Sequence, residues 1–264
     1  MEQFLIPLLL FALLGGLFGL LLAVAARAFA VKEDERLAPV REALPGGNCG
    51  GCGYSGCDAY AAAVVRGEAP PDLCGVGGAE SAAQIAAVMG LAVSGKKPLS
   101  AVVLCSGCDG VALKKYHYAG APDCHSAARM AGGDKRCAHS CIGLGSCAAV
   151  CPFGAISVAD GVAKIDPAAC RACGLCVSAC PMGVIRLLPK DAPLAVLCSS
   201  HEDGKSTRAA CTVGCIGCRI CEKKCPTHAI RVENNLALID PDLCTGCGAC
   251  AQACPRKIIK PILS

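Results

Sequence analysis

The hydrophobic pattern begins with one long apolar segment near the amino terminus. Residues 4–26 contain no charged side chain and would span roughly 34 Å as a helix, which is enough to cross a bilayer. Glu2 precedes the segment, and four basic side chains follow it: Arg27, Lys32, Arg36 and Arg41. Because cytoplasmic flanks carry the excess of Lys and Arg, we expect a single-pass helix in the cytoplasmic (inner) membrane, with the remaining chain in the cytoplasm.

A cleaved signal peptide is the alternative for this segment, with residues 28–30 resembling a cleavage site. The apolar run is longer than signal peptides use, and no basic residues precede it. We therefore expect residues 1–30 to form a membrane anchor.

Patterns of short helices and strands follow the anchor. Residues 31–45 are charged and contain proline, which indicates a linker or a short helix, and the Ala-rich segments 58–66 and 79–89 predict two short helices. In the second half, two hairpins are expected 74 residues apart, and this spacing indicates a duplication: residues 155–158 with 162–165, and residues 229–232 with 236–239. Two further apolar runs, 102–105 and 196–198, each end in a cysteine.

Cysteine content changes this picture from an ordinary mixed fold to a metal protein. The chain has 25 Cys among 264 residues, only 3% aromatic residues and no Trp, so metal groups are expected to replace part of the apolar core. The odd number and the two-residue spacings favour metal ligands in a reducing compartment over disulfides. The net charge of +4 indicates no particular partner, and we expect no nucleic-acid partner.

Two ligand runs of the form Cys-x2-Cys-x2-Cys-x3-Cys-Pro lie near the carboxyl terminus. In such runs three cysteines bind one 4Fe–4S cluster and the fourth binds its neighbour, whereas zinc sites use two Cys-x2-Cys pairs separated by a longer loop. Two clusters are therefore expected, on Cys215, Cys218, Cys221 and Cys254, and on Cys244, Cys247, Cys250 and Cys225.

The same pattern of cysteine ligands occurs 74 residues earlier in the chain, with one ligand missing. Cys151, Cys170, Cys173 and Cys176 predict a third cluster. Cys141, Cys147 and Cys180 lack a fourth thiolate because Leu144 stands where the repeat has Cys218. We expect Cys137 to complete this fourth site; a three-iron cluster and ligation by His139 are the alternatives.

A separate group comes before the repeats. Cys49, Cys52, Cys57 and the distant Cys74, in a glycine-rich setting, predict a fifth cluster, with a zinc turn as the alternative. Five cysteines remain outside these groups: Cys105, Cys108, Cys124, Cys198 and Cys211. They could be buried small hydrophobic residues. Alternatively, Cys105, Cys108 and Cys124 could form an incomplete metal site. We expect about five 4Fe–4S clusters, with six as the alternative.

In its order of parts the chain resembles the B subunit of the Rnf complex, in an extended form with two ferredoxin pairs. An apolar anchor, the motif GGCGYSGC with a distant Cys, and repeats ending in CTGCGACAQACP carry the resemblance over nearly the whole length. The expected fold is α+β: a transmembrane helix, a small helical 4Fe–4S domain and duplicated ferredoxin-like modules. The expected boundaries are 1–30 for the anchor, 31–95 for the single-cluster domain, and 96–190 and 191–264 for the modules.

The resemblance implies a subunit of a membrane-bound, ion-translocating ferredoxin:NAD oxidoreductase that moves Na+ or H+. This chain would accept electrons from soluble ferredoxin and relay them to other subunits, held to the bilayer by residues 4–26. It lacks a GxGxxG after a strand and a flavin-attachment motif, so we expect no complete active site in this chain alone. The alternative is a related membrane complex that reduces a redox regulator instead of pumping ions.

The order of the ligand groups suggests a direction for the electrons. The group on Cys49 lies nearest the anchor and is the predicted exit toward the membrane, so electrons would enter at the C-terminal module. Four basic residues beside the terminal ligand loops could attract an acidic ferredoxin, or could form an ordinary solvated face: Lys223, Lys224, Arg256 and Lys257.

Overall fold

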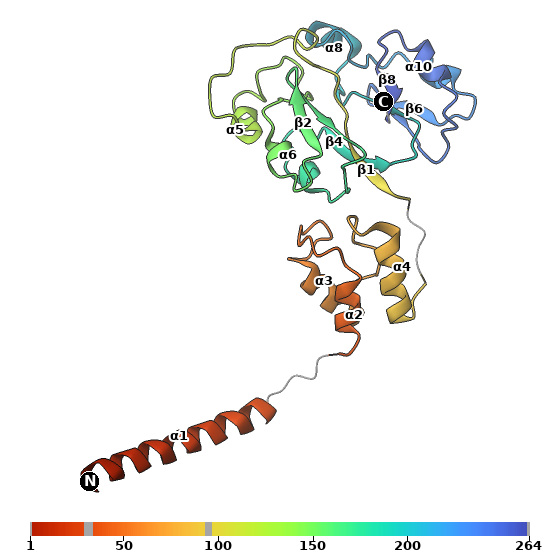
Figure 1. Ribbon diagram of the computed structural model, residues 1–264. Helices are drawn as coiled ribbons and strands as arrows, with labels where there is room; N and C mark the ends of the chain where they lie inside the picture. Colours follow the sequence, from red (N-terminus) through yellow and green to blue (C-terminus); the bar gives the residue numbers. More distant parts are fainter. Residues whose placement is uncertain (1, 29–33, 93–96, 263–264) are drawn as a thin grey trace.

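The computed structural model describes residues 2–28, 34–92 and 97–262 (Figure 1). Lys32 and the predicted boundary between residues 95 and 96 lie outside these described residues.

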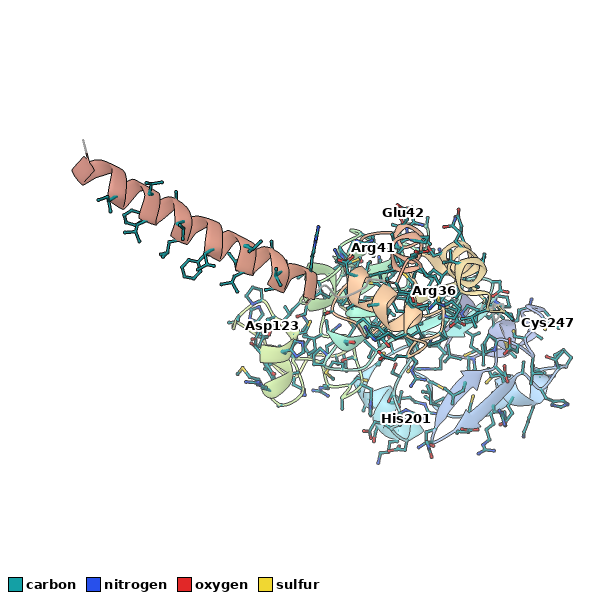
Figure 2. All side chains as sticks on the ribbon, turned by 90° about the horizontal axis from the view of Figure 1, so that it is seen from below. Arg36, Arg41, Glu42, Asp123, His201 and Cys247 are labelled. Atoms are coloured by element: carbon teal, nitrogen blue, oxygen red, sulfur yellow. The ribbon has the colours of Figure 1, made fainter. Side chains whose placement is uncertain are left out.

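The apolar segment forms one continuous helix, α1 (Glu2–Ala28). Its stretch Leu9–Arg27 has a mean hydropathy of 2.6, and none of it is buried against the rest of the protein. Exposed apolar side chains project from it between Leu9 and Val24 (Figure 2). A helix of this length and composition is suited to cross a membrane.

Residues 34–92 form a small helical domain with its own core. Val40, Tyr60, Val64 and Ile85 are almost fully buried where its helices meet. The helices are α2 (Leu37–Glu42), α3 (Cys57–Val65) and α4 (Gly78–Met89). As the Ala-rich pattern predicted, α3 and α4 lie on either side of the loop that carries Cys74.

The Tyr60 hydroxyl holds this loop against α3. It donates a hydrogen bond to the Pro70 carbonyl (2.8 Å) and accepts one from the Leu73 amide (3.2 Å). The position of Cys74, next in the chain, therefore depends on a side chain of α3.

The next part, module 1, consists of two antiparallel strand pairs with short helices at the ligand loops. Strand β1 (Leu99–Val103) pairs with β4 (Ile185–Pro189), and β2 (Ile156–Ala159) pairs with β3 (Val162–Ile165). The helices are α5 (Cys124–Arg129), α6 (Ser146–Ala149) and α7 (Leu175–Ser178).

Module 2 repeats the two strand pairs and the ligand-loop helices of this plan. Strand β5 (Leu194–Val196) pairs with β8 (Ile259–Pro261), and β6 (Ile230–Glu233) pairs with β7 (Leu236–Ile239). The helices are α8 (Gly204–Ala210), α9 (Ile220–Lys224) and α10 (Ala249–Ala253).

Both predicted hairpins are confirmed, and their turns explain the residues found there. Asp160 and Gly161 have φ values of 52° and 70°, and Asn234 and Asn235 have values of 47° and 62°. Two successive left-handed residues make the type I′ turn that matches strand twist, and Asp, Asn and Gly adopt it most readily.

Each module has a small apolar core into which cysteines project. The described sheets have only two strands each, and thiols such as Cys147, Cys176, Cys221 and Cys250 are buried among Val and Ile side chains. So small a core gives limited stability by itself.

The modules are joined by backbone hydrogen bonds between the segments near residues 111–113 and 210–212. The Leu113 amide donates to the Ala210 carbonyl (2.9 Å), and the Thr212 amide donates to the Val111 carbonyl (3.0 Å). The Ser199 hydroxyl also reaches the Leu104 carbonyl (2.8 Å). These contacts fix the distance between the first loops of the two modules.

We expect Tyr60→Phe to loosen the loop that carries Cys74. The Pro70 carbonyl and the Leu73 amide would lose their partner in a partly buried setting, which costs about 1 kcal/mol or somewhat more. In hydrogen–deuterium exchange on the full-length protein, the amides of residues 72–75 should then exchange roughly tenfold faster. Tyr54→Phe is the control, because it keeps the ring contact with Tyr60 (5.6 Å between centroids) and leaves the loop hydrogen bonds intact. Equal exchange in both variants would contradict this role.

Candidate iron–sulfur cluster sites

In the helical domain the four predicted ligands converge on one pocket. Cys49, Cys52, Cys57 and Cys74 line an empty volume of about 410 Å³, part of it open to solvent. The Asn48 side chain accepts a hydrogen bond from the Cys57 amide (2.8 Å) at the start of α3, and the Gly77 amide donates to the Cys74 sulfur (3.3 Å). Backbone N–H groups aimed at sulfur are the usual second shell of iron–sulfur ligands.

The first site in module 1 has the crossed composition that the spacing predicts. Cys151 joins Cys170, Cys173 and Cys176 around an empty volume of about 320 Å³. The Cys170 sulfur accepts hydrogen bonds from the amides of Ala101 (3.4 Å) and Ala172 (3.5 Å).

The second site in module 1 differs from the sequence-based prediction in its fourth ligand. Cys141, Cys147 and Cys180 share a pocket of about 340 Å³ with Cys124, and Cys137 does not line it. Cys124 is therefore the fourth thiol of this pocket, in place of the cysteine that the repeat would have at Leu144.

A hydrogen-bond relay explains how a residue so distant in sequence reaches this pocket. The Ser146 hydroxyl accepts from the Cys124 amide (2.8 Å) and donates to the Asp123 carboxylate (2.8 Å). Hydrogen bonds, first from the Ser126 amide and then from Ser146, lower the pKa of Asp123 to about 2. Asp123 is therefore ionised at neutral pH and ties the start of α5 to the start of α6, beside Cys147.

Cys137 lies instead in a pocket between the modules, with Cys105, Cys198 and Cys211. Its empty volume is about 350 Å³. Three of these four cysteines were left without an assigned role by sequence reasoning. The sequence does contain a sign of this pairing, because Cys137 and Cys211 are separated by the repeat offset of 74 residues and so occupy equivalent positions.

In module 2 the thiols group as the crossed-ligand rule predicts. Burial raises the pKa of Cys221 to about 11, and the neighbouring thiols of Cys215, Cys218 and Cys254 raise it further. Burial also raises the pKa of Cys250, with contributions from Cys225 and Cys244.

The exposure of the ligands differs between the two modules. Cys218 and Cys247, both in module 2, are the two exposed cysteines among the 25, all of which lie in the described residues. Cys247 lies at the periphery of the molecule (Figure 2).

The donor sets fit iron–sulfur clusters. Every group consists of thiols on glycine-containing loops, and all 25 cysteines are free. Within residues 2–28, 34–92 and 97–262, no three His, Cys, Asp or Glu side chains are placed to hold a single metal ion. Thiolates around one zinc would lie only about 3.8 Å apart, given Zn–S bonds of about 2.3 Å. A cubane, with an iron at each thiolate, holds its four sulfur ligands farther apart.

A buried cation lies beside these thiols. Lys135 is only 2% exposed, and its ammonium group donates to the carbonyls of Gly107 (2.8 Å), Cys141 (2.8 Å) and Gly161 (2.7 Å). A buried charge is costly unless hydrogen bonds and opposite charge surround it. Anionic clusters on the adjacent thiolates would supply that charge.

Arg256 does not belong to the predicted basic face. Its guanidinium donates to the carbonyls of Gly214 (3.1 Å) and Cys211 (2.7 Å) and so holds ligand loops together. Lys223, Lys224 and Lys257 are exposed.

Neighbouring groups lie close enough for their thiols to interact. Burial raises the pKa of four thiols, and a thiol of the adjoining group adds to each shift: Cys49 for Cys173, Cys147 for Cys176, Cys105 for Cys141, and Cys215 for Cys198. In module 2, Cys221 and Cys225 lie near the two ends of α9. The groups therefore follow one another in a row.

Family models match the same three regions. A model described as a putative Fe-S cluster matches residues 44–76, and one described as a 4Fe-4S dicluster domain matches residues 140–184 and 214–258.

The chain is also similar to curated proteins over most of its length. The B subunit of the Na(+)-translocating ferredoxin:NAD(+) oxidoreductase complex of Acetobacterium woodii is 44% identical, over 92% of this chain and 74% of that protein. The B subunit of an ion-translocating oxidoreductase complex from Methanosarcina acetivorans is 43% identical over 88% of both chains. The B subunit of the proton-translocating ferredoxin:NAD(+) oxidoreductase complex of Clostridium ljungdahlii is 41% identical, over 92% of this chain and 87% of that protein. The chain belongs to the family of B subunits of Rnf-type ion-translocating oxidoreductase complexes.

Proposed function

We propose that this chain is the electron relay of a membrane-bound ferredoxin:NAD oxidoreductase that translocates Na+ or H+. It would accept electrons from a soluble reduced ferredoxin and pass them to the membrane-embedded subunits. One observation carries the proposal: the thiol groups follow one another from the exposed ligands of module 2 to the helical domain, which follows the anchor in the chain.

Electrons would enter at module 2. An electron donor must approach a ligand closely, and Cys218 and Cys247 are the exposed ligands. Near them, Ile220 (39% exposed) and Leu243 (52% exposed) offer an apolar contact. The exposed Lys223 and Lys224 at the end of α9 would attract an acidic ferredoxin.

Electrons would leave through the helical domain. Cys173 of module 1 lines the same pocket as Cys49, so the two groups meet directly. Gly51 makes this approach possible, because a Cβ atom there would lie 2.2 Å from the Cys173 carbonyl oxygen. The segment between α1 and residue 34 can span at most roughly 20 Å, which keeps this domain near the bilayer surface.

When bound, the 4Fe–4S clusters would supply one-electron carriers that change little in geometry. The protein's residues hold the thiols at fixed positions, shield them from water and direct N–H groups at sulfur. Those hydrogen bonds, burial and nearby charge set the reduction potentials. We place these domains on the cytoplasmic side of a single-pass anchor, since Arg27, Arg36 and Arg41 follow the apolar segment.

We expect Cys221→Ser and Cys250→Ser each to abolish ferredoxin-dependent NAD reduction in membranes that contain the assembled complex. Each change removes a buried ligand from one site of module 2. Cys108→Ser is the control, because Cys108 is a half-buried cysteine outside the predicted ligand sets. If both module 2 variants kept full activity, this module could not be the point where electrons enter.

A charge reversal tests the docking of ferredoxin. The double variant Lys223→Glu/Lys224→Glu should raise the KM for ferredoxin roughly tenfold at low ionic strength, with the difference shrinking as salt screens the charges. Lys205→Glu/Arg208→Glu, which makes the same change in charge on α8, should leave this KM unaltered. An equal effect from both pairs would show that net charge, rather than a docking surface, is responsible.

Gly51→Ala should separate the helical domain from module 1 without removing a ligand. The added methyl group would meet the Cys173 carbonyl, whereas at Gly47 it would meet no protein atom within 4 Å. We expect unchanged iron content but slower reduction of the helical domain's cluster in stopped-flow EPR, relative to Gly47→Ala. Identical rates in the two variants would rule out electron transfer through this contact.

A further inference from the structure

The pocket between the two modules contains four cysteines, two from each module. Cys105 and Cys137 come from module 1, and Cys198 and Cys211 come from module 2. Its empty volume of about 350 Å³ lies within the range of the three pockets lined by predicted ligands, 320 to 410 Å³. The similar volume shows that these four thiols surround a space of the same size as the groups that the ligand spacing predicts.

The two halves of this pocket are equivalent in the repeat. Cys105 follows the end of β1 by two residues, and Cys198 follows the end of β5 by two residues. Cys137 and Cys211 each precede the first cysteine of a ferredoxin run by four positions. A single module supplies only two thiols, so the site requires both.

The sulfurs are surrounded by backbone N–H groups in the same way in both halves. Cys105 accepts from the amides of Gly107 (3.4 Å) and Cys141 (3.4 Å). Cys198 accepts from the amides of Ser200 (3.5 Å) and Cys215 (3.3 Å). At Cys170, a predicted cluster ligand, the sulfur likewise accepts a hydrogen bond from the amide two residues later in the chain. Such bonds stabilise thiolate ligands and tune a cluster.

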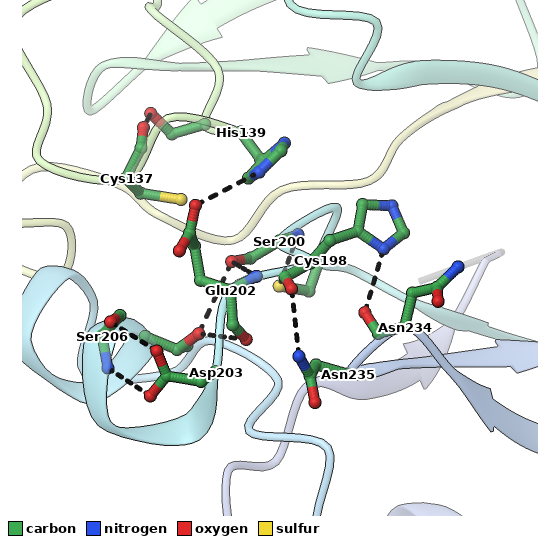
Figure 3. Close-up of polar contacts among 12 residues, drawn as sticks. Cys137, His139, Cys198, Ser200, Glu202, Asp203, Ser206, Asn234 and Asn235 are labelled. Carbon is green, nitrogen blue, oxygen red and sulfur yellow. Dashed lines mark hydrogen bonds and ion pairs between the residues drawn. The ribbon is translucent and has the colours of Figure 1, made fainter.

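Contacts at the edge of the pocket hold the two modules together. Figure 3 shows Cys137 and Cys198 approaching from different segments, with His139 of module 1 paired to Glu202 of module 2 (3.8 Å). Ser200 and Thr207 line the same pocket and are buried, with their hydroxyl oxygens 3.5 Å apart. The ligand geometry is therefore supported from both sides.

Cationic side chains flank the pocket and suit an anionic group within it. Lys135 binds the carbonyls of Gly107 and Cys141, beside Cys105. Arg256 binds the carbonyls of Cys211 and Gly214 in the other half. Four thiolates on a cubane would give the net negative charge that these two cations can balance.

We infer that Cys105, Cys137, Cys198 and Cys211 bind a further 4Fe–4S cluster that connects the two ferredoxin modules. Its ligands are contiguous with both neighbouring sites, because the Cys141 amide touches the Cys105 sulfur and the Cys215 amide touches the Cys198 sulfur. The inference rests on the proposed electron-relay function. One electron would leave the reduced cluster of module 2, reduce this cluster, and then pass to module 1, with no bond broken and no proton moved.

Iron content of the unmodified protein gives the first test. The full-length chain, purified anaerobically and reconstituted, should contain about 24 iron atoms and about 24 sulfides, which correspond to six cubanes. A content of about 20 iron atoms with full activity would overturn the inference and leave the proposed function standing. An iron-free chain would overturn both.

Variants locate the extra cluster. Cys105→Ala/Cys198→Ala should lose about four iron atoms, and Cys108→Ala, in the same Cys-x2-Cys motif, should lose none. When ferredoxin is the reductant, only the two clusters of module 2 should be reduced rapidly in the double variant, about two fifths of the visible bleaching that dithionite produces.

Two results would contradict the inference. One is an unchanged iron content in the double variant, with rapid reduction of all clusters by ferredoxin. The other is one zinc atom per chain that disappears together with these thiols, which would assign the pocket to zinc. If the double variant fails to fold, the iron content of the unmodified chain still decides between five clusters and six.

Discussion

The convergence of four thiols from separate loops around one inorganic cube is the constraint on which the rest of this structure depends. The loops must turn sharply and approach closely, which explains left-handed residues such as Gly50, Gly145, Gly174 and Gly248. The pockets so formed occupy the space where an ordinary domain would place aromatic side chains. Because the described sheets have only two strands each, much of the folding free energy must come from metal binding.

Buried negative charge is the second requirement, and backbone groups meet most of it. Amides donate hydrogen bonds to the sulfurs of Cys74, Cys105, Cys170 and Cys198. Lys135 adds a full positive charge at one point, held by three carbonyls rather than by an acidic partner. A carboxylate there would compete with the thiolates for the cation, whereas carbonyls orient its ammonium group and leave its charge free to act on the clusters.

Local patterns were enough to predict the hairpins and the Ala-rich helices, because turn residues and helix formers act over short distances. The crossed ligand sets of module 2 stay a prediction, and the thiols found near Cys221 and Cys250 agree with it. Local patterns failed for Cys124, since the segment carrying it has no copy in module 2 and packs in a small core of its own with Ala127 and Ile142. Cys137 was assigned by nearness in sequence, although its spatial neighbours Cys198 and Cys211 lie in the other module. Arg256 was read as part of a basic face because hydrogen bonds to distant carbonyls leave no trace in the sequence.

Leu144 has an effect beyond the loss of a ligand. At the matching place in module 2, Cys218 is exposed to solvent, but Leu144 is half-buried and packs against the core formed by Cys124, Ala127 and Ile142. The site in module 1 therefore has the buried thiol of Cys124 where the site in module 2 has the exposed thiol of Cys218, and apolar side chains cover it. Along the proposed electron path, module 1 is thereby better shielded from solvent than module 2, so dioxygen and other small oxidants should reach its centres more slowly.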